Sequence, residues 1–156
     1  PGRASMLTAM LLGSRFSVVT MWKHWFHLYE KTISDLSIQD HVASIRSIDV
    51  APDNQSLLAG KEEDIFPLLL AEAKAAIAED RADVILLGST TMHQAHRHLS
   101  DNLDVPVINP GPLTYKLVEA MLGLGLSHSR AAYPASPVPR TEMIAAMMAA
   151  AGQFEH

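Results

Sequence analysis

Cysteine is absent from this chain of 156 residues. Its absence excludes disulfide bonds, zinc–thiolate sites and thiol nucleophiles from the chemistry of the chain. Basic residues are also few, because Lys and Arg total 12 against 17 Asp and Glu, which leaves a formal net charge of −5. A protein that binds nucleic acid without sequence preference needs a basic surface. The composition therefore argues against nucleic acid as a partner.

Long hydrophobic runs are missing as well. No apolar run approaches the ~20 residues that a helix needs to cross a bilayer, so we expect no membrane partner. The segment 1–13 carries one Arg and a short apolar stretch, and it continues into a strand-like segment without a cleavage-like site. We interpret it as folded structure rather than a signal peptide. Apolar residues still make up 48% of the chain, and we expect a cytoplasmic α/β domain with a substantial core.

Short β-rich segments alternate with longer helical patterns along the chain. Four strands are predicted near residues 15–20, 43–50, 83–87 and 105–108. The third is a continuous apolar run, which is typical of a central parallel strand covered on both faces. This alternation predicts βαβ units joined by right-handed crossovers. The predicted fold class is α/β, with an open, parallel, four-stranded sheet and flanking helices.

The helical segments are marked by apolar periodicity, glycines and prolines. Pro67 is tolerated only in the first turn of a helix, which places the start of the strongest helix near Ile65. Met143, Met147 and Met148 are expected to form the core stripe of a terminal helix. The remaining boundaries predict a helix that closes at Gly13, helices over 21–36 and about 91–100, a loop over 51–60, a helix from Pro112 and a terminal helix over 142–151.

Candidate site residues follow the carboxyl ends of three predicted strands. Open parallel sheets bind ligands at this edge, and the segments there are Thr20–Met21, Gly88–Thr91 and Asn109–Gly111. Gly88 permits a tight turn, and three hydroxyl residues follow it at the start of a helix. Two interpretations stay open: Ser89 or Thr90 caps the helix, or the segment binds a carboxylate or another anion. One residue can do both.

Other chemistry is weakly supported by the local sequence. Ser89 as a nucleophile needs a base within hydrogen-bond reach, and the G-x-S-x-G elbow is absent. His93, His96 and His98 are interpreted as solvated helix residues rather than metal ligands, because no carboxylate nearby in sequence completes a ligand set. His93 lies early enough in the helix to face the pocket. Two further histidines are expected in packing or surface roles: His24 and His27.

Three segments in a fixed order carry a family resemblance. They are RFSVVT at 15–20, ADVILLGSTTM at 82–92 and VPVINPGPLTYKLVEAMLGLGLSHSR at 105–130. The sequence resembles the aspartate/glutamate/hydantoin racemase superfamily, closest to its hydantoin and allantoin racemase branch and to a group of hydrogenase-expression accessory proteins. The resemblance extends over about residues 4–133. It implies two similar α/β lobes and cofactor-independent proton transfer by two cysteines, one from each lobe, at the carbon next to a carboxylate or hydantoin carbonyl.

Applied to this chain, the resemblance implies roles for individual residues. Residues 1–110 correspond to the second lobe, and 111–156 to a C-terminal segment that returns toward the first lobe, most of which is absent from the chain. The family's G-C-x-x-M motif falls on Gly88–Met92, so Ser89 occupies the position of a catalytic thiol. No cofactor or metal is implied. The residues implied in substrate binding are Thr20, Gly88, Thr90, Thr91, Pro110 and Gly111.

The serine at the thiol position leaves more than one function open. An aliphatic hydroxyl is a far weaker acid than a thiol, whose pKa is about 8.5. One hypothesis is a racemase-type isomerase with impaired proton transfer, acting on a small carboxylate or hydantoin-like ligand. Another is a non-catalytic ligand-binding or hydrogenase-expression accessory protein. A third, a phosphate-binding regulatory domain of flavodoxin-like architecture, rests on the helix N-terminus alone. Surface helices rich in Ala and Met are compatible with a homo-oligomer.

Overall fold

Four parallel strands form one open sheet in the order β2-β1-β3-β4. The structure, a computed structural model, describes residues 1–51, 53 and 61–151. Every residue of β1 and β3 is buried, whereas β2, at the edge of the sheet, is half-buried. The strands are β1 (Phe16–Thr20), β2 (Val42–Ser47), β3 (Val84–Leu87) and β4 (Val107–Ile108). The predicted parallel α/β sheet is confirmed, with all four segments in their expected places.

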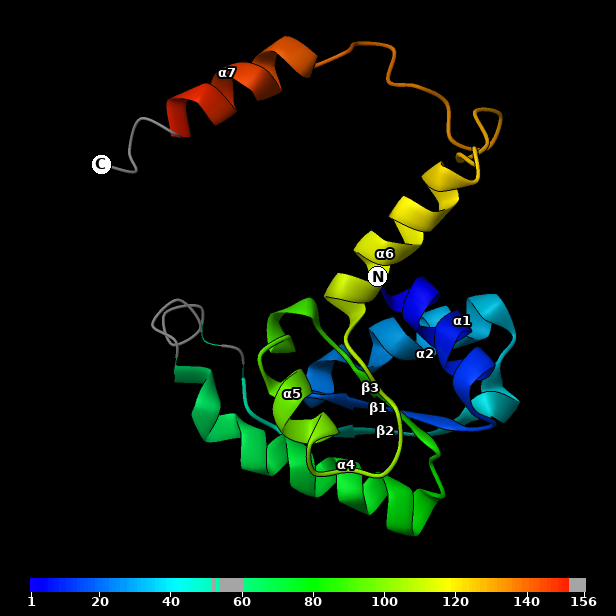
Figure 1. Cartoon of the computed structure of the whole chain (residues 1–156), viewed down its shortest axis with the longest axis vertical. Coiled ribbons are helices and arrows are strands. Elements are labelled where there is room, and N and C mark those ends of the chain that lie inside the picture. Colours follow the sequence, from blue (N-terminus) through cyan, green and yellow to red (C-terminus); the bar gives the residue numbers. More distant parts are fainter. Residues whose placement is uncertain (52, 54–60, 152–156) are drawn as a thin grey trace. The chain divides into compact units, whose positions relative to one another are not determined.

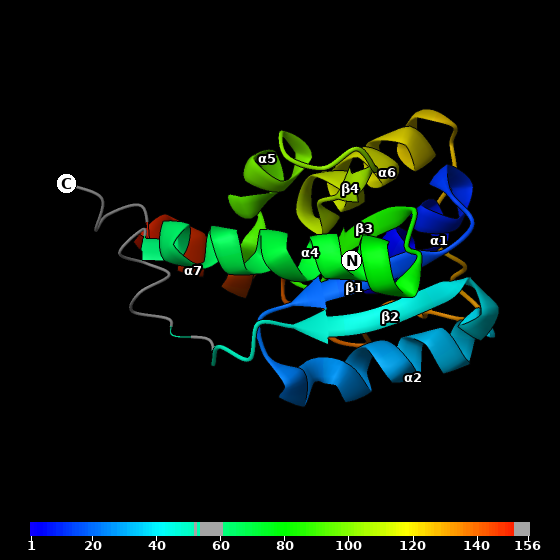
Figure 2. The same cartoon turned by 90° about the horizontal axis from the view of Figure 1, so that it is seen from below.

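Helices cover both faces of this sheet. The helices that pack on it are α1 (Gly2–Leu12), α2 (Phe26–Leu36), α4 (Phe66–Asp80) and α5 (Ala95–Ser100), and α6 (Pro110–Gly123) follows β4. Successive side chains of a strand point to opposite faces, so Val18 packs with α1 and α2 while Val19 packs with α4 and α5. Figures 1 and 2 show α1 and α2 on one side of the strands and α4 and α5 on the other. The core therefore has three layers, with the sheet between two layers of helices.

Two helices begin later than the sequence pattern predicts. The helix expected over 21–36 starts at Phe26, after a short 3₁₀ turn. The helix expected over 91–100 starts at Ala95, and a 3₁₀ turn over Thr90–Met92 precedes it. In both places the chain leaves the carboxyl end of a strand and turns onto a face of the sheet. Tight 3₁₀ geometry is common in such helix entries, and the apolar period does not reveal it.

Prolines mark the start of two other helices. The prediction near Ile65 is confirmed, because α4 starts at Phe66 with Pro67 in its first turn. The start predicted at Pro112 is wrong by two residues, since α6 begins at Pro110. Both prolines fit the first turn, where the backbone N–H has no helical partner to lose. The loop predicted over 51–60 lies outside the described residues, apart from Ala51 and Asp53.

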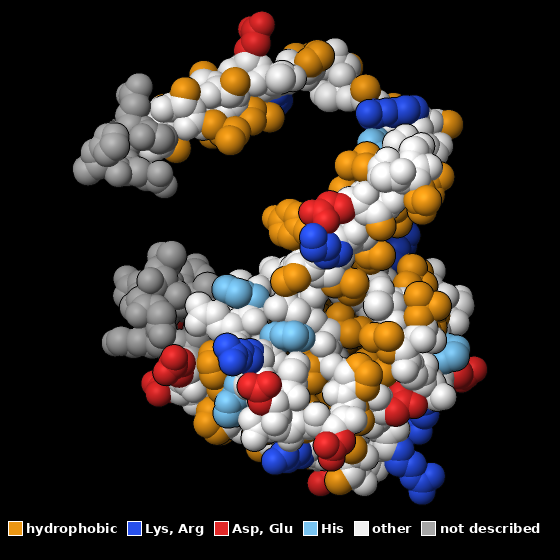
Figure 3. All heavy atoms as spheres, viewed as in Figure 1, with side chains coloured by type: hydrophobic (Ala, Val, Ile, Leu, Met, Phe, Trp, Pro, Cys, Tyr) orange, Lys and Arg blue, Asp and Glu red, His pale blue; other side chains and the backbone are white. Residues whose placement is uncertain are grey.

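The chain divides into two units, Pro1–Ala120 and Met121–His156. The second unit contains α7 (Thr141–Ala151), which confirms the predicted terminal helix. The core stripe expected there is wrong: Met143, Met147 and Met148 are 48%, 63% and 72% exposed, and hydrophobic side chains lie along the surface of α7 in Figure 3. Every described residue of this unit is exposed, so no second layer buries the stripe.

Within the described ranges no helix is long and apolar enough to span a membrane.

Candidate functional site

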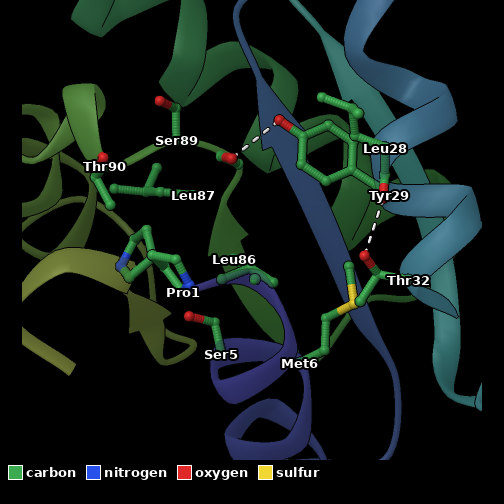
Figure 4. Close-up of a pocket in the computed structure, with 13 residues that line it drawn as sticks. Pro1, Ser5, Met6, Leu28, Tyr29, Thr32, Leu86, Leu87, Ser89 and Thr90 are labelled. Atoms are coloured by element: carbon green, nitrogen blue, oxygen red, sulfur yellow. Dashed lines mark hydrogen bonds between the residues drawn. The ribbon is translucent and has the colours of Figure 1, made fainter. Parts of the chain in front are cut away.

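A cavity of about 280 Å³ lies where the carboxyl end of β3 meets α1 and α2. The turn after β3 contributes Gly88, Ser89 and Thr90 to its wall, and Figure 4 shows α1 and α2 on the facing sides. The other lining residues are Pro1, Gly2, Ser5, Met6, Leu28, Tyr29, Thr32, Leu86, Leu87 and Pro110. The cavity therefore occupies the edge of the sheet where parallel α/β folds place their ligands.

Tyr29 joins α2 to the turn after β3. Its phenol donates a hydrogen bond of 2.9 Å to the Gly88 carbonyl, and the Thr20 hydroxyl lies 2.9 Å from the same Tyr29 oxygen. Burial raises the pKa of the Tyr29 phenol, partly offset by the hydrogen bond with Thr20. The phenol therefore stays protonated at neutral pH and remains a donor. A Cβ at Gly88 would lie 2.6 Å from the Tyr29 hydroxyl oxygen, so only glycine fits this turn.

Ser89 caps the 3₁₀ turn that follows it. Its hydroxyl oxygen accepts a hydrogen bond of 3.3 Å from the Thr91 backbone N–H and lies 2.8 Å from the Thr91 hydroxyl oxygen. Ser89 thus caps the 3₁₀ turn and not α5 itself, whose N-cap residue, Gln94, makes no side-chain capping hydrogen bond, and anion binding stays a prediction. Ser89 is half-buried and Thr90 is exposed. The segment thus holds a serine hydroxyl and a threonine side chain at the cavity wall in a turn that the chain itself stabilises.

The structure brings four of the predicted site residues to this cavity: Gly88, Ser89, Thr90 and Pro110. Thr20 is fully buried and reaches the cavity wall through its hydrogen bond to Tyr29. Thr91 is outside the lining and turns its hydroxyl to Ser89. Gly111 lines a second cavity instead. The predicted residues therefore fall into three groups. Some line the cavity, Thr20 and Thr91 hydrogen-bond to residues that line it, and Gly111 lines a neighbouring cavity.

The second cavity, of about 510 Å³, shares Thr90 with the first. Its other lining residues are Pro1, His93, Gly111, Pro112, Thr114 and Tyr115. His93 is exposed at this wall. His98 of the same cluster lines a different cavity, with Phe66 and Arg97.

The neighbouring histidines are more enclosed than their sequence pattern predicts. His96 and His98 were expected to be solvated, and both are half-buried. The Nε2 atom of His96 lies 3.1 Å from the Val107 carbonyl oxygen, and the His98 ring lies 5.8 Å from the Phe66 ring. The expectation is wrong because α5 packs on α4 and β4. His24 and His27 are exposed, as predicted. Among the described residues no three His, Cys, Asp or Glu side chains form a group able to hold a metal ion.

Several cavity residues are not apparent from the sequence. Ser5 and Met6 lie in a helix expected only to end at Gly13, and Tyr29 lies in α2, within the helix expected over 21–36. The tyrosine carries one usable signal, because a buried phenol normally seeks a hydrogen-bond partner. Nothing in the sequence indicates that this partner is the carbonyl of residue 88.

Known proteins match both the sequence and this fold. The sequence profile of the Asp/Glu/Hydantoin racemase family matches residues 1–118. A hydantoin racemase from Rhizobium meliloti is 34% identical over 137 residues, which cover 85% of this chain and 55% of the relative. The crystal structure of an allantoin racemase from Pseudomonas fluorescens matches with a TM-score of 0.74 and 29% identity, over 88% of this chain and 57% of the other. An allantoin racemase from Klebsiella pneumoniae matches with a TM-score of 0.71 and 26% identity, over 81% of this chain and 51% of the other.

The match covers most of this chain but only part of each relative. The chain spans about half the length of the relatives it matches. The family profile, in contrast, covers most of this chain and includes every residue that lines the cavity at Gly88–Thr90. The chain belongs to the Asp/Glu/hydantoin racemase family.

Proposed function

We propose that this chain forms one lobe of a racemase-type site that binds a small carboxylate or hydantoin-like ligand. The observation that carries the proposal is the cavity bounded by Gly88, Ser89 and Thr90, in a chain whose residues 1–118 match the racemase family. The ligand's carboxylate or ring carbonyl lies against the Ser89–Thr91 turn, where the exposed Thr90 side chain lines the cavity. The reacting carbon then faces Ser89. No cofactor takes part in this proposal.

The proposed chemistry is proton transfer at the carbon next to the carboxylate or ring carbonyl. Inversion at this carbon needs one group to remove a proton and a second group to return one on the opposite face. Ser89 stands on one face, and its oxygen is already held by Thr91. A serine hydroxyl is too weak an acid to exchange protons near neutrality without a base. We therefore propose that this chain binds its ligand but transfers protons slowly.

Among the side chains that commonly act as general bases, His93 is the nearest in sequence to this turn. It lines the second cavity, which shares Thr90 with the first, and histidine is the side chain that most often acts as a general base. Proton transfer by His93 alone would exchange the α-proton with solvent on one face and leave the configuration unchanged. Isotope exchange without loss of optical rotation is the signature of this route.

A second function, ligand binding without catalysis, is favoured by the absence of cysteine from the sequence. It shares the cavity with the first proposal and differs only in the fate of the α-proton. Binding therefore tests the site, and isotope exchange distinguishes the two functions.

The experiment measures binding, loss of optical rotation and solvent deuterium exchange for the purified chain. Allantoin, 5-substituted hydantoins, aspartate and glutamate serve as ligands. We expect binding with little or no loss of rotation, and Ser89→Cys should raise exchange while Ser89→Ala, the matched control, should not. His93→Gln removes any one-sided exchange that remains. Rapid racemisation by the cysteine-free chain contradicts the slow proton transfer, and absence of binding by every ligand contradicts the site.

A further inference from the structure

One buried hydroxyl of the cavity has no hydrogen-bond partner in the part of the chain that the structure describes. Ser5, in the first half of α1, is fully buried, and its hydroxyl makes no hydrogen bond within the described residues. Ser5 lines the cavity next to Met6, and Figure 4 shows its hydroxyl directed toward the side where Pro1 and Thr90 lie. Buried polar groups nearly always have a partner, so an unpartnered one indicates a missing water, ion or ligand.

The other hydroxyls on the buried walls are already engaged. Thr32 donates its hydrogen to the Leu28 carbonyl at 3.0 Å, and Tyr29 donates to Gly88. Ser89 is held by Thr91. These hydrogen bonds stabilise helices and turns of the protein itself. Ser5 differs because its hydroxyl faces the cavity without such a bond.

The side chains nearest Ser5 are apolar, and no charged side chain is near them in the cavity lining. Met6 and Leu86 lie beside Ser5 in Figure 4, and Leu28 lines the same cavity from α2. No Asp, Glu, Lys, Arg or His is among the described residues that line it. A charged group placed here would lose its water without gaining an opposite charge from a side chain, which is costly. The walls therefore favour a neutral group with a short body and a polar end.

We propose that Ser5 is a ligand-contacting residue that selects the substituent on the reacting carbon. Its hydroxyl receives the polar end of a neutral substituent, such as a ureido, carboxamide or hydroxyl group, while Met6, Leu28 and Leu86 surround the body of that substituent. The inference rests on the proposed function, because it places the same ligand with its ring or carboxylate at Ser89–Thr91. The cavity, at about 280 Å³, has the space of roughly nine water molecules at ~30 Å³ each, enough for a small ring with a short substituent.

The test compares two ligands of matched shape on the purified chain. Allantoin carries a ureido group at the position where 5-isobutylhydantoin carries an isobutyl group of the same size and branching. Ser5→Ala should weaken allantoin binding about five- to tenfold, the loss of one neutral hydrogen bond. The affinity for 5-isobutylhydantoin should change less than about twofold, because that substituent makes no hydrogen bond. Titration calorimetry or NMR titration measures both affinities.

Controls separate this inference from folding and from the proposed function. Alanine has the higher helix propensity, so Ser5→Ala should fold, and Ser5→Cys gives a second variant of nearly the same shape with a weaker donor. Ser34→Ala, an exposed serine in α2, is the matched control and should alter neither affinity. Equal losses for the two ligands, or no loss for allantoin, overturn the role of Ser5 while leaving the cavity as a binding site. Failure of the unmodified chain to bind either ligand, or aspartate and glutamate, overturns the proposed function instead.

Discussion

The phenol of Tyr29 donates a hydrogen bond of 2.9 Å to the carbonyl of Gly88. These residues are 59 positions apart in the sequence, and the contact joins α2 to the turn that carries Ser89. Thr20, the last residue of β1, supplies a hydroxyl 2.9 Å from the same phenol oxygen. The position of the serine at the cavity wall therefore depends on a buried polar contact as well as on strand β3.

Tyr29→Phe tests this contact through stability. The substitution leaves the Gly88 carbonyl and the buried Thr20 hydroxyl without their shared partner, and a buried polar group that loses its hydrogen bond costs about 1–3 kcal/mol. Urea unfolding should show a loss in that range. Tyr133→Phe, at a residue that is 62% exposed, should stay within about 0.5 kcal/mol of the unmodified chain. Equal stability of the two variants would contradict the contact.

The same tyrosine predicts how stability changes in alkaline solution. Burial raises the pKa of Tyr29, so the unfolded chain releases this proton first, near pH 10. The stabilisation that results is complete below about pH 10 and is lost as pH rises through the pKa of the folded state. Tyr29→Phe should abolish this part of the alkaline loss, which unfolding curves at a series of pH values measure. An unchanged pH profile would show that another group causes it.

Gly88→Ala should destabilise the fold. A Cβ there would lie 2.6 Å from the Tyr29 hydroxyl oxygen and 2.8 Å from the Thr20 Cβ, and forced overpacking typically costs about 1–3 kcal/mol. Gly123→Ala is the control, because a Cβ there meets nothing within 4 Å. Adding Tyr29→Phe to Gly88→Ala removes one of the two clashes, so the combined loss should be smaller than the sum of the single losses. Strict additivity in thermal or urea unfolding would contradict the clash.

The fold was largely predictable because its signals are local. Segment 15–20 is rich in β-forming residues, segment 83–87 is a short apolar run, and Pro67 falls in a first helical turn, all of which a single sequence reveals. The terminal methionines show where this reasoning fails. An apolar helical stripe indicates that a face can be buried, but Met147 stays 63% exposed because burial also requires a second layer, and the pattern does not say whether one exists.

The sequence predicted only the part of the candidate site that lies at the carboxyl ends of the strands. Gly88, Ser89 and Thr90 follow a buried strand, and parallel sheets place ligands there. Ser5 and Tyr29 complete the cavity from helices distant in sequence, and their roles depend on which side chains meet after folding. The half-buried state of His96 has the same origin, since its partner is the carbonyl of Val107 on the neighbouring strand.

A charged cluster at the edge of the sheet predicts the acid response of the fold. Arg46 on β2 pairs with Glu79 and Asp80 at 2.6 Å each and with Glu72 at 3.5 Å. The hydrogen bond from Arg46, with a second one from Ser44, lowers the pKa of Asp80. The unfolded chain then binds this proton more readily, so the stabilisation is present above the unfolded pKa of ~3.9 and is lost as pH falls through the folded pKa.

Arg46→Gln removes the positive partner of this cluster. We expect a loss of about 1 kcal/mol at neutral pH, as for a partly exposed ion-pair network, and a flatter dependence of stability on pH below about 4. Lys31→Gln, which breaks the more exposed pair with Asp35, is the control and should have a smaller effect. Thermal unfolding between pH 3 and 7 measures both. If Arg46→Gln kept the acid dependence of the unmodified chain, Asp80 would not be its source.

Thr90→Val tests the proposed ligand contact at the turn itself. Thr90 lines both cavities and is exposed, so the substitution keeps the shape of the side chain while removing its hydroxyl from the wall. A ligand oxygen that loses this hydrogen bond inside the cavity should bind more weakly by about 1–3 kcal/mol. Thr91→Val is the contrasting variant, because its hydroxyl lies against Ser89 rather than in the lining, and it should lower stability more than affinity. Calorimetric titration with allantoin, beside urea unfolding of each variant, separates the two effects. Equal affinities of Thr90→Val and the unmodified chain would place the ligand away from this turn.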